Sequence, residues 1–262
     1  MPEKTEYAPG TPSWTDLGTP DFEASTRFYG ELFGWRAEEP GPIEETGGYT
    51  MFTLRGKNIA GMGPLQEGQP PAWGTYVSVS DADTTTKAAK NAGATVMLEP
   101  MDVMDAGRVA VFVDPTGAVI SIWQPNQHIG AQLVNEPGTP CWNELDTRDT
   151  EKSKAFYTEL FGWGTDAMPM GEGAKYTIWT LDGQGVGGML PMPDMVPDEV
   201  PNNWLTSFAV DDCDASVSKL ESLGGSVLAP ATDMEGVGRF AVVADPHGAA
   251  FSVIKLAEVR VE

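Results

Sequence analysis

The spacing of apolar residues along the first 125 positions predicts a strand, a helix and then further strands, and this order occurs twice. A short strand is predicted at residues 14–18, and from Thr19 onward a Thr-Pro or Asp start signal opens a helix that Gly34 closes. Within that helix Phe22, Phe28 and Leu32 fall near one stripe, as they do on a buried helix face.

The segments that follow are rich in strand-forming residues, and only one of them has a helical composition. An alanine-rich run predicts a second helix at residues 82–92, which ends at Gly93. The predicted strands lie at residues 49–54, 58–63, 74–79, 95–98, 109–114 and 119–123.

The second half of the chain repeats the first. FYGELFGW begins at Phe28 and FYTELFGW at Phe156, and GRVAVFVDPTGA at Gly107 recurs as GRFAVVADPHGA at Gly238. YTMFTLRG, which begins at Tyr49, recurs as YTIWTLDG. The spacing between copies drifts by a few residues, as loop insertions between fixed elements would cause, so the chain is a tandem duplication.

Runs of strands after each helix indicate an α+β fold, because a doubly wound parallel sheet would need strands and helices in strict alternation. The repeat predicts an N-terminal tail at residues 1–11, a first domain at 12–125, a linker at 126–139 and a second domain at 140–257.

Charge and composition limit the classes of partner that we expect for this protein. The chain has 38 acidic and 16 basic residues, a net charge of −22, which disfavours binding to nucleic acid or to an anionic membrane surface. We find no signal peptide at the N-terminus and no apolar run of about 20 residues, so we expect a cytoplasmic protein. The expected state is a monomer with an internal pseudo-dimer, or a homodimer. Cys141 and Cys213 fall at unrelated places in the repeats and are interpreted as ordinary small residues.

The FY-x-x-L-F-G-W ending of each first helix and the D-P-x-G-A before each last strand resemble the vicinal oxygen chelate superfamily of glyoxalases, bleomycin-resistance proteins and extradiol dioxygenases. The likeness is strongest to its actinobacterial two-domain members, called glyoxalase-like or hydroxylase-like. It implies two βαβββ modules per domain, forming cupped, mostly antiparallel sheets with helices outside. Members of this superfamily differ widely in function, so the fold alone does not define the activity.

The resemblance also implies positions for metal ligands, and this chain has unsuitable residues there. Such a site needs three or four His, Glu, Gln or Asp side chains on one ion. We therefore expect no metal and no cofactor. His128 in the linker and His247 in the second D-P-x-G turn are interpreted as loop residues. The implied positions hold Trp14, Met62, Gly74 and Ser121 in the first copy, and Trp142, Met189, Leu205 and Ser252 in the second.

Strand alternation predicts what would line a cavity. If Trp14 faces it, Asp16 does too, and the second copy offers Trp142 and Glu144, with Asp146 one step further. An unpaired buried carboxylate is costly, so it needs a donor from the ligand or from the protein. The structural alternative is that each carboxylate caps a turn or pairs with an arginine, either Arg108 or Arg239. The expected ligand-binding residues are Trp14, Asp16, Met62, Ser121, Trp142, Glu144, Met189 and Ser252.

Three functions fit these residues. The first is a metal-independent protein that binds an antibiotic or metabolite, as bleomycin-resistance proteins do. The second is a glyoxalase-like or hydroxylase-like enzyme acting on a small carbonyl or aromatic metabolite, with Asp16 or Glu144 as general base or as part of an unorthodox metal site. The third is a structural or interaction protein whose cavities are filled.

Overall fold

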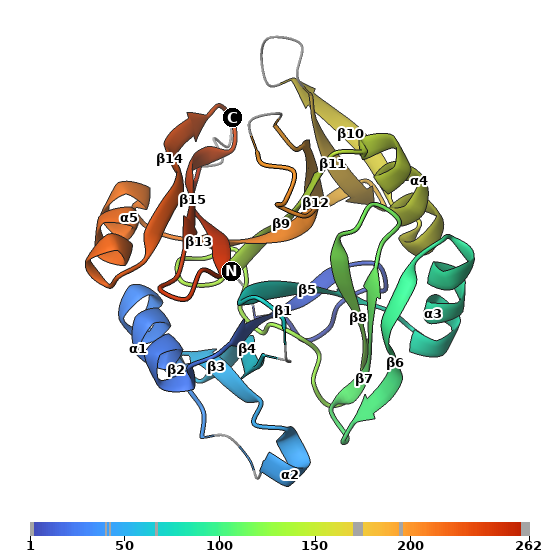
Figure 1. The fold of residues 1–262 in the computed structure, drawn as a ribbon, viewed down its shortest axis with the longest axis horizontal. Coiled ribbons are helices and arrows are strands. Elements are labelled where there is room, and N and C mark those ends of the chain that lie inside the picture. Colours follow the sequence, from blue (N-terminus) through green and yellow to red (C-terminus); the bar gives the residue numbers. More distant parts are fainter. Residues whose placement is uncertain are drawn as a thin grey trace.

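Two curled sheets of eight strands make up most of the molecule (Figure 1). The computed structural model describes residues 3–39, 41, 43–65, 68–169, 175–193 and 196–257. The first sheet has the strand order β2-β3-β4-β1-β5-β8-β7-β6, and the second has the same order, β10-β11-β12-β9-β13-β16-β15-β14. The predicted tandem α+β fold is therefore confirmed, and each sheet takes all its strands from one half of the chain.

The elements follow one another in the predicted order. The strands of the first sheet are β1 Pro12–Thr19, β2 Arg36–Ala37, β3 Thr50–Leu54, β4 Lys57–Pro64, β5 Ala72–Ser78, β6 Thr95–Val103, β7 Gly107–Val113 and β8 Val119–Pro125. Those of the second are β9 Pro140–Thr147, β10 Gly164–Pro169, β11 Lys175–Leu181, β12 Gln184–Pro191, β13 Asn203–Ala209, β14 Ser226–Met234, β15 Gly238–Ala244 and β16 Ala250–Leu256. The helices are α1 Phe22–Phe33, α2 Ile43–Thr46, α3 Ala82–Asn91, α4 Thr150–Phe161 and α5 Cys213–Ser222.

Local signals determine where the helices begin and end. The Asp21 side chain accepts a hydrogen bond from the Ala24 backbone N–H, so the aspartate of the two predicted start signals caps α1, which begins at Phe22. Gly34 ends the helix at φ 78°, a left-handed conformation that suits glycine. Strand β2 and helix α2 are too short for a periodic pattern and were not predicted. No helix in the described part of the chain is long and apolar enough to cross a membrane.

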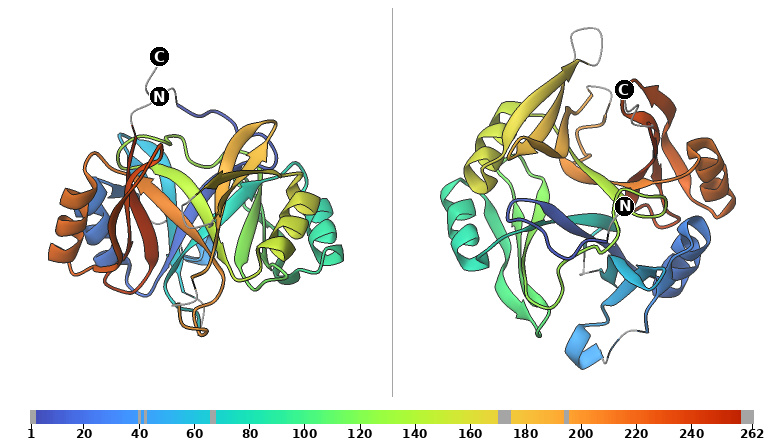
Figure 2. Two further views of the ribbon diagram at one scale, coloured as in Figure 1. Left: turned by 90° about the horizontal axis from the view of Figure 1, so that it is seen from above. Right: turned by 180° about the vertical axis from the view of Figure 1, so that it is seen from behind.

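Each sheet joins two modules of its own half through a central antiparallel pair, β1 with β5 or β9 with β13. Parallel pairing is confined to β1–β4, β5–β8 and their counterparts in the second half. The sheets lie back to back with the helices outside, α1 beside α5 and α3 beside α4 (Figures 1 and 2). We call the concave face of the β1–β8 sheet the first cup and that of the β9–β16 sheet the second cup.

The two halves share their hydrophobic cores. One core packs the first module of the first half, with Leu17 and Phe28, against the second module of the second half, with Phe208 and Phe251. The other core packs the second module of the first half against the first module of the second half, so the modules pair crosswise. Buried tyrosines join the halves in both cores. The Tyr29 hydroxyl donates to Asp245 Oδ2 over 3.1 Å, and the Tyr157 hydroxyl donates to Asp114 Oδ2 over 2.7 Å. The convex faces are therefore fully buried only when both halves are present.

We expect Tyr157→Phe to lower the free energy of unfolding by about 1–3 kcal/mol, because Asp114 loses a donor in a buried site and Trp204 Nε1 loses its acceptor. Urea denaturation measures the change. Tyr7→Phe is the matched control. It removes one hydrogen bond, from the hydroxyl of this N-terminal tyrosine to the backbone carbonyl of Ala131. An equal or smaller loss for Tyr157→Phe than for Tyr7→Phe would contradict the importance of the bond between the halves.

Candidate functional site

The alternation of side chains along β1 and β9 brings the predicted aromatic and acidic residues into the cups. Leu17 and Leu145 are fully buried in the shared cores, on the convex faces. Trp14 and Asp16 have the opposite parity to Leu17 and therefore face the first cup. Trp142 and Glu144 take the same places in the second cup.

A hydrogen-bonded chain connects these residues in each cup. Trp14 Nε1 donates to the Tyr49 hydroxyl over 2.9 Å, and that hydroxyl donates to Asp16 Oδ2 over 3.2 Å. In the second cup Trp142 Nε1 donates to the Tyr176 hydroxyl over 2.8 Å, and Tyr176 is hydrogen-bonded to Glu144. We call this unit the Trp–Tyr–carboxylate chain. Its tyrosines were not predicted as site residues, although their recurrence in the repeat was a usable signal.

A glycine makes room for each tyrosine. Gly61 lies opposite Asp16 in the β1–β4 pair, and Gly188 lies opposite Glu144. A Cβ atom at either glycine would overlap the tyrosine hydroxyl. The repeated glycine on β4 and β12 is therefore explained by the close approach of a side chain.

The adjacent methionines do not belong to the cups, contrary to our expectation. Met62 lies opposite Leu17 and Met189 opposite Leu145, so the strand register turns both to the convex faces. Their exposed fractions are 1% and 0%, and both pack in the shared cores. A ligand in either cup does not reach them.

The predicted serines do face the cups, in the row that contains the tryptophans. Trp14 lies opposite Tyr76, which lies opposite Ser121 and is hydrogen-bonded to it. In the second cup the corresponding row runs from Trp142 through Ser207 to Ser252. A tyrosine in the first cup is thus replaced by a serine in the second.

The carboxylate of the first cup is buried but hydrogen-bonded. The Tyr76 hydroxyl donates to Asp16 Oδ2 over 2.6 Å, which makes two tyrosine donors on one oxygen. Burial raises the pKa of Asp16 to about 6, while the hydrogen bonds from Tyr76 and Tyr49 oppose this rise. Asp16 is therefore an acid that titrates near neutral pH.

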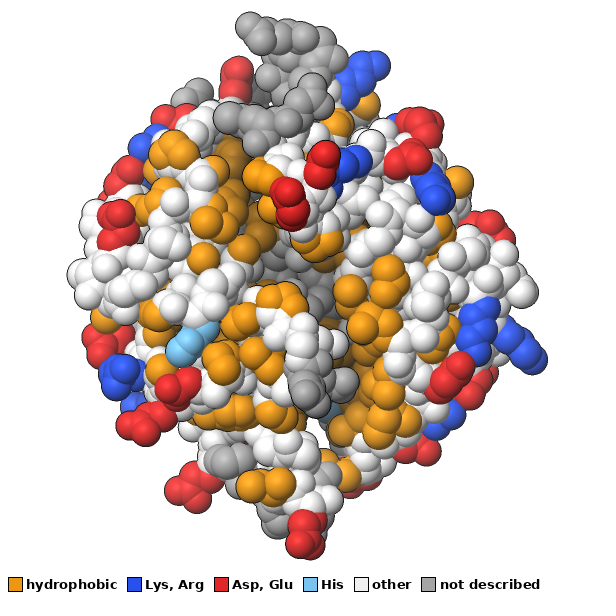
Figure 3. Space-filling view, viewed as in Figure 1, with side chains coloured by type: hydrophobic (Ala, Val, Ile, Leu, Met, Phe, Trp, Pro, Cys, Tyr) orange, Lys and Arg blue, Asp and Glu red, His pale blue; other side chains and the backbone are white. Residues whose placement is uncertain are grey.

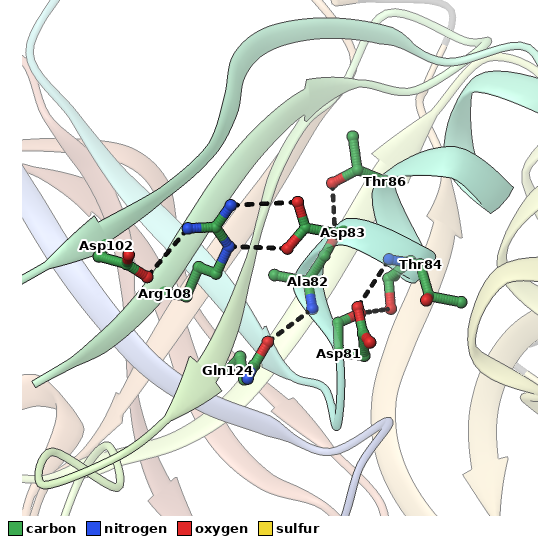
Figure 4. A network of polar contacts seen from close by, with 9 residues as sticks. Asp81, Ala82, Asp83, Thr84, Thr86, Asp102, Arg108 and Gln124 are labelled. Carbon is green, nitrogen blue, oxygen red and sulfur yellow. Dashed lines mark hydrogen bonds and ion pairs between the residues drawn. The ribbon is translucent and has the colours of Figure 1, made fainter.

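The arginines proposed as structural partners lie elsewhere. Arg108 binds Asp83 at the start of α3 through two nitrogens and Asp102 on β6 through a third (Figure 4). Arg239 makes the same contacts in the second half, with Asp214 and Asp233. The interpretation that an arginine neutralises the carboxylate in each cup is therefore wrong, because both guanidinium groups are occupied by acids of their own modules.

The second cup has two carboxylates. Glu144 and Asp146 are alternate residues of β9 and so face the same side. Burial raises the pKa of Glu144, and burial together with the Glu144 charge raises the pKa of Asp146 to about 8. The corresponding position of the first cup is Gly18. The second cup is therefore the more acidic of the two.

His128 packs at the first cup rather than standing free in a loop. Its ring lies edge-to-face against Trp14, with centroids 4.4 Å apart, and Trp123 Nε1 donates to its backbone oxygen. Burial lowers the pKa of His128 to about 4, so the imidazole is neutral at pH 7. Nothing in the local sequence places the linker against β1. His247 remains in its turn, where its backbone N–H donates to Asp245.

The first cup also has an open apolar wall. Met97 and Met101 on β6 and Val119 on β8 are 50%, 47% and 48% exposed. Figure 3 shows apolar side chains along the β7–β8 side of the molecule, while most charged side chains lie toward the rim. An exposed apolar wall beside polar groups is typical of a surface that contacts a ligand.

The donor set does not fit a divalent metal. In the described part of the chain no three His, Cys, Asp or Glu residues lie close enough together to hold one. The row of the first cup where ligands were implied contains Trp14, Tyr76 and Ser121, and the second cup offers two carboxylates only. Neither cup supplies the three or four ligands that such an ion needs.

Comparison with known proteins gives a consistent family. The sequence profile of the glyoxalase/bleomycin resistance protein/dioxygenase superfamily matches residues 11–122 and again 142–253. "Putative glyoxylase CFP32" of Mycobacterium tuberculosis is 44% identical, over 97% of this chain and 98% of its own. "Anthracycline biosynthesis protein DnrV" of Streptomyces peucetius is 38% identical, over 97% and 96%.

Solved structures share the fold. The Mn(II)-bound glyoxalase from Novosphingobium aromaticivorans superposes with a TM-score of 0.66 at 16% identity, over 94% of this chain and 82% of that one. The 2,2',3-trihydroxybiphenyl 1,2-dioxygenase of Sphingomonas wittichii gives a TM-score of 0.65 at 15% identity, over 95% and 91%. At such low identity the likeness extends to the fold alone.

We expect Asp16→Asn to flatten the pH dependence of stability. The raised pKa of Asp16 means that the folded state holds its proton more tightly than the unfolded state. Its contribution is thus fully present below about pH 4 and is lost as pH rises through about 6. Between pH 4 and 7 the wild type should lose about 2–3 kcal/mol more stability than Asp16→Asn, as measured by urea denaturation. Parallel curves for the two proteins would contradict the raised pKa.

Proposed function

The chain belongs to the glyoxalase/bleomycin resistance protein/dioxygenase superfamily, and from this premise we propose that it binds a small organic molecule in its cups without using a metal. The observation that carries the proposal is the Trp–Tyr–carboxylate chain, which stands on the strands where the family resemblance implies metal ligands. Its recurrence in both halves supports a role for the Trp–Tyr–carboxylate chain rather than for one accidental contact.

The chemistry of the cups supports a planar ligand with a hydrogen-bond donor. An indole offers a broad face for stacking, and a carboxylate accepts hydrogen bonds and fixes orientation. Both tyrosines of the first cup donate to Oδ2 of Asp16, and the second oxygen, Oδ1, lies beside Gly74, which has no side chain. The name of the anthracycline biosynthesis relatives is consistent with an aromatic ligand.

Trp142 is the better ligand contact of the two tryptophans. Trp14 is only 6% exposed and packs against His128, whereas Trp142 is half-buried. Removing Trp14 would therefore disturb packing as well as binding. Trp142 presents more of its indole to the second cup.

One observation favours a second function, an enzyme of the glyoxalase-like or hydroxylase-like kind. A general base works best when its pKa lies near the working pH, and burial raises the pKa of Asp16 to about 6. Asp16 would accept a proton from a bound carbonyl or hydroxyl compound, and Tyr49 and Tyr76 would hold its carboxylate in place. This function requires turnover, and it predicts that Asp16→Asn loses activity while ligand binding remains.

We expect Trp142→Ala to weaken the binding of a planar probe by about 2- to 30-fold, which corresponds to about 0.5–2 kcal/mol of lost stacking. Isothermal titration with 2-naphthylmethanol and with an anthracycline measures the change. Leu228→Ala is the control, because this exposed residue of β14 lies in the same half and outside the Trp–Tyr–carboxylate chain. Wild-type affinity in Trp142→Ala would contradict a site in the second cup.

We also expect the purified protein to contain well below one transition metal ion per domain after dialysis against a weak chelator, because the cups lack a third ligand. Elemental analysis tests this. A stoichiometric metal that survives dialysis in wild type and is lost in Glu144→Gln would overturn the metal-independent proposal.

A further inference from the structure

The two cups differ in the residues that surround the same Trp–Tyr–carboxylate chain. Tyr76 of the first cup, the second donor to Asp16, corresponds to Ser207. Gly18, at the end of β1, corresponds to Asp146. The second cup has therefore lost a hydrogen-bond donor and gained a carboxyl group relative to the first.

The second cup leaves its acids without a neutralising partner. Glu144 is partly buried and hydrogen-bonded to Tyr176, and no described side chain donates a hydrogen bond to Asp146. The salt bridges between described residues involve neither acid, and Arg239, a cation of the same half, is bound to Asp214 and Asp233. Two partly buried carboxylates on one face repel each other when both are ionised, and a cation between them would remove that cost.

A cation bound by these two acids would have an aromatic neighbour. Trp142, Glu144 and Asp146 are alternate residues on one face of β9, so their Cα atoms are spaced by about 7 Å along the strand. An ammonium group placed between the two carboxylates would leave the organic part of a ligand next to the half-buried indole. Indole faces also attract cations directly.

We infer that the second cup selects a cationic ligand, an aromatic or apolar molecule with a protonated amine, and that Glu144 and Asp146 hold the ammonium group. This inference rests on the proposed binding function and specifies the charge of its ligand. The first cup, where tyrosines already donate to the single carboxylate, lacks this preference.

Three probes of equal ring size test the charge preference: 2-naphthylmethylamine, which is protonated at neutral pH, neutral 2-naphthylmethanol and anionic 2-naphthylacetate. Isothermal titration of the full-length protein should show the amine binding at least about tenfold more tightly than the alcohol, and the acetate more weakly than either. Asp146→Asn should lower the affinity for the amine about tenfold and leave the affinity for the alcohol unchanged.

Two controls separate local from general charge effects. Asp166→Asn removes an exposed acid of β10 in the same half and should leave all three affinities unchanged. Glu159→Gln removes an exposed acid of α4 in the same half and should likewise leave all three affinities unchanged. A loss of amine affinity in Asp166→Asn as large as in Asp146→Asn would show attraction by net charge alone and overturn the inference.

The remaining outcomes distinguish this inference from the proposed function. If the alcohol binds, Trp142→Ala weakens it and the amine binds no more tightly, the charge preference is wrong and the binding function stands. If none of the three probes binds, the inference and the proposed binding of planar ligands both fall.

Discussion

The apolar convex face of each sheet is covered partly by its own helices and partly by the other half, and the rest of the structure depends on this constraint. A curled sheet with an apolar convex face and a helix at each end has no stable form in water on its own. Crosswise packing of the four modules removes those faces from solvent, and Tyr29 and Tyr157 fix the arrangement by hydrogen bonds to Asp245 and Asp114. As a consequence, the concave faces point away from each other and remain open.

The concave faces carry the polar groups of the proposed site because the convex faces are filled by the shared cores. Side chains alternate along β1 and β9, so the residues on either side of the core leucine of each strand point into the cup. In each cup an indole N–H, a phenol and a carboxylate then form one hydrogen-bonded chain, with a glycine beneath the phenol. Such an arrangement places groups that can accept hydrogen bonds or stack on rings on the strands where the family resemblance implies metal ligands.

Duplication provided two copies of the Trp–Tyr–carboxylate chain, and the residues around the two copies differ. The first cup satisfies its single acid internally and has an apolar wall of methionine and valine side chains. The second keeps two acids with fewer donors. The shared cores place little constraint on these residues, because side chains on the concave faces do not take part in the packing between the halves.

The sequence by itself determined the duplication, the α+β order and the parity of the site residues. Helix periodicity, the cap at Gly34 and the repeated motifs are local properties, and so is the alternation that placed Trp14 with Asp16 and Trp142 with Glu144 on one face. It did not determine the registers between strands, which turned Met62 and Met189 into the core. Nor could it pair Tyr49 with Trp14, engage Arg108 with Asp83, or bring His128 from the linker onto the first cup. Those contacts join residues far apart in the chain, and only the packing of the sheets and of the two halves decides which distant side chains meet.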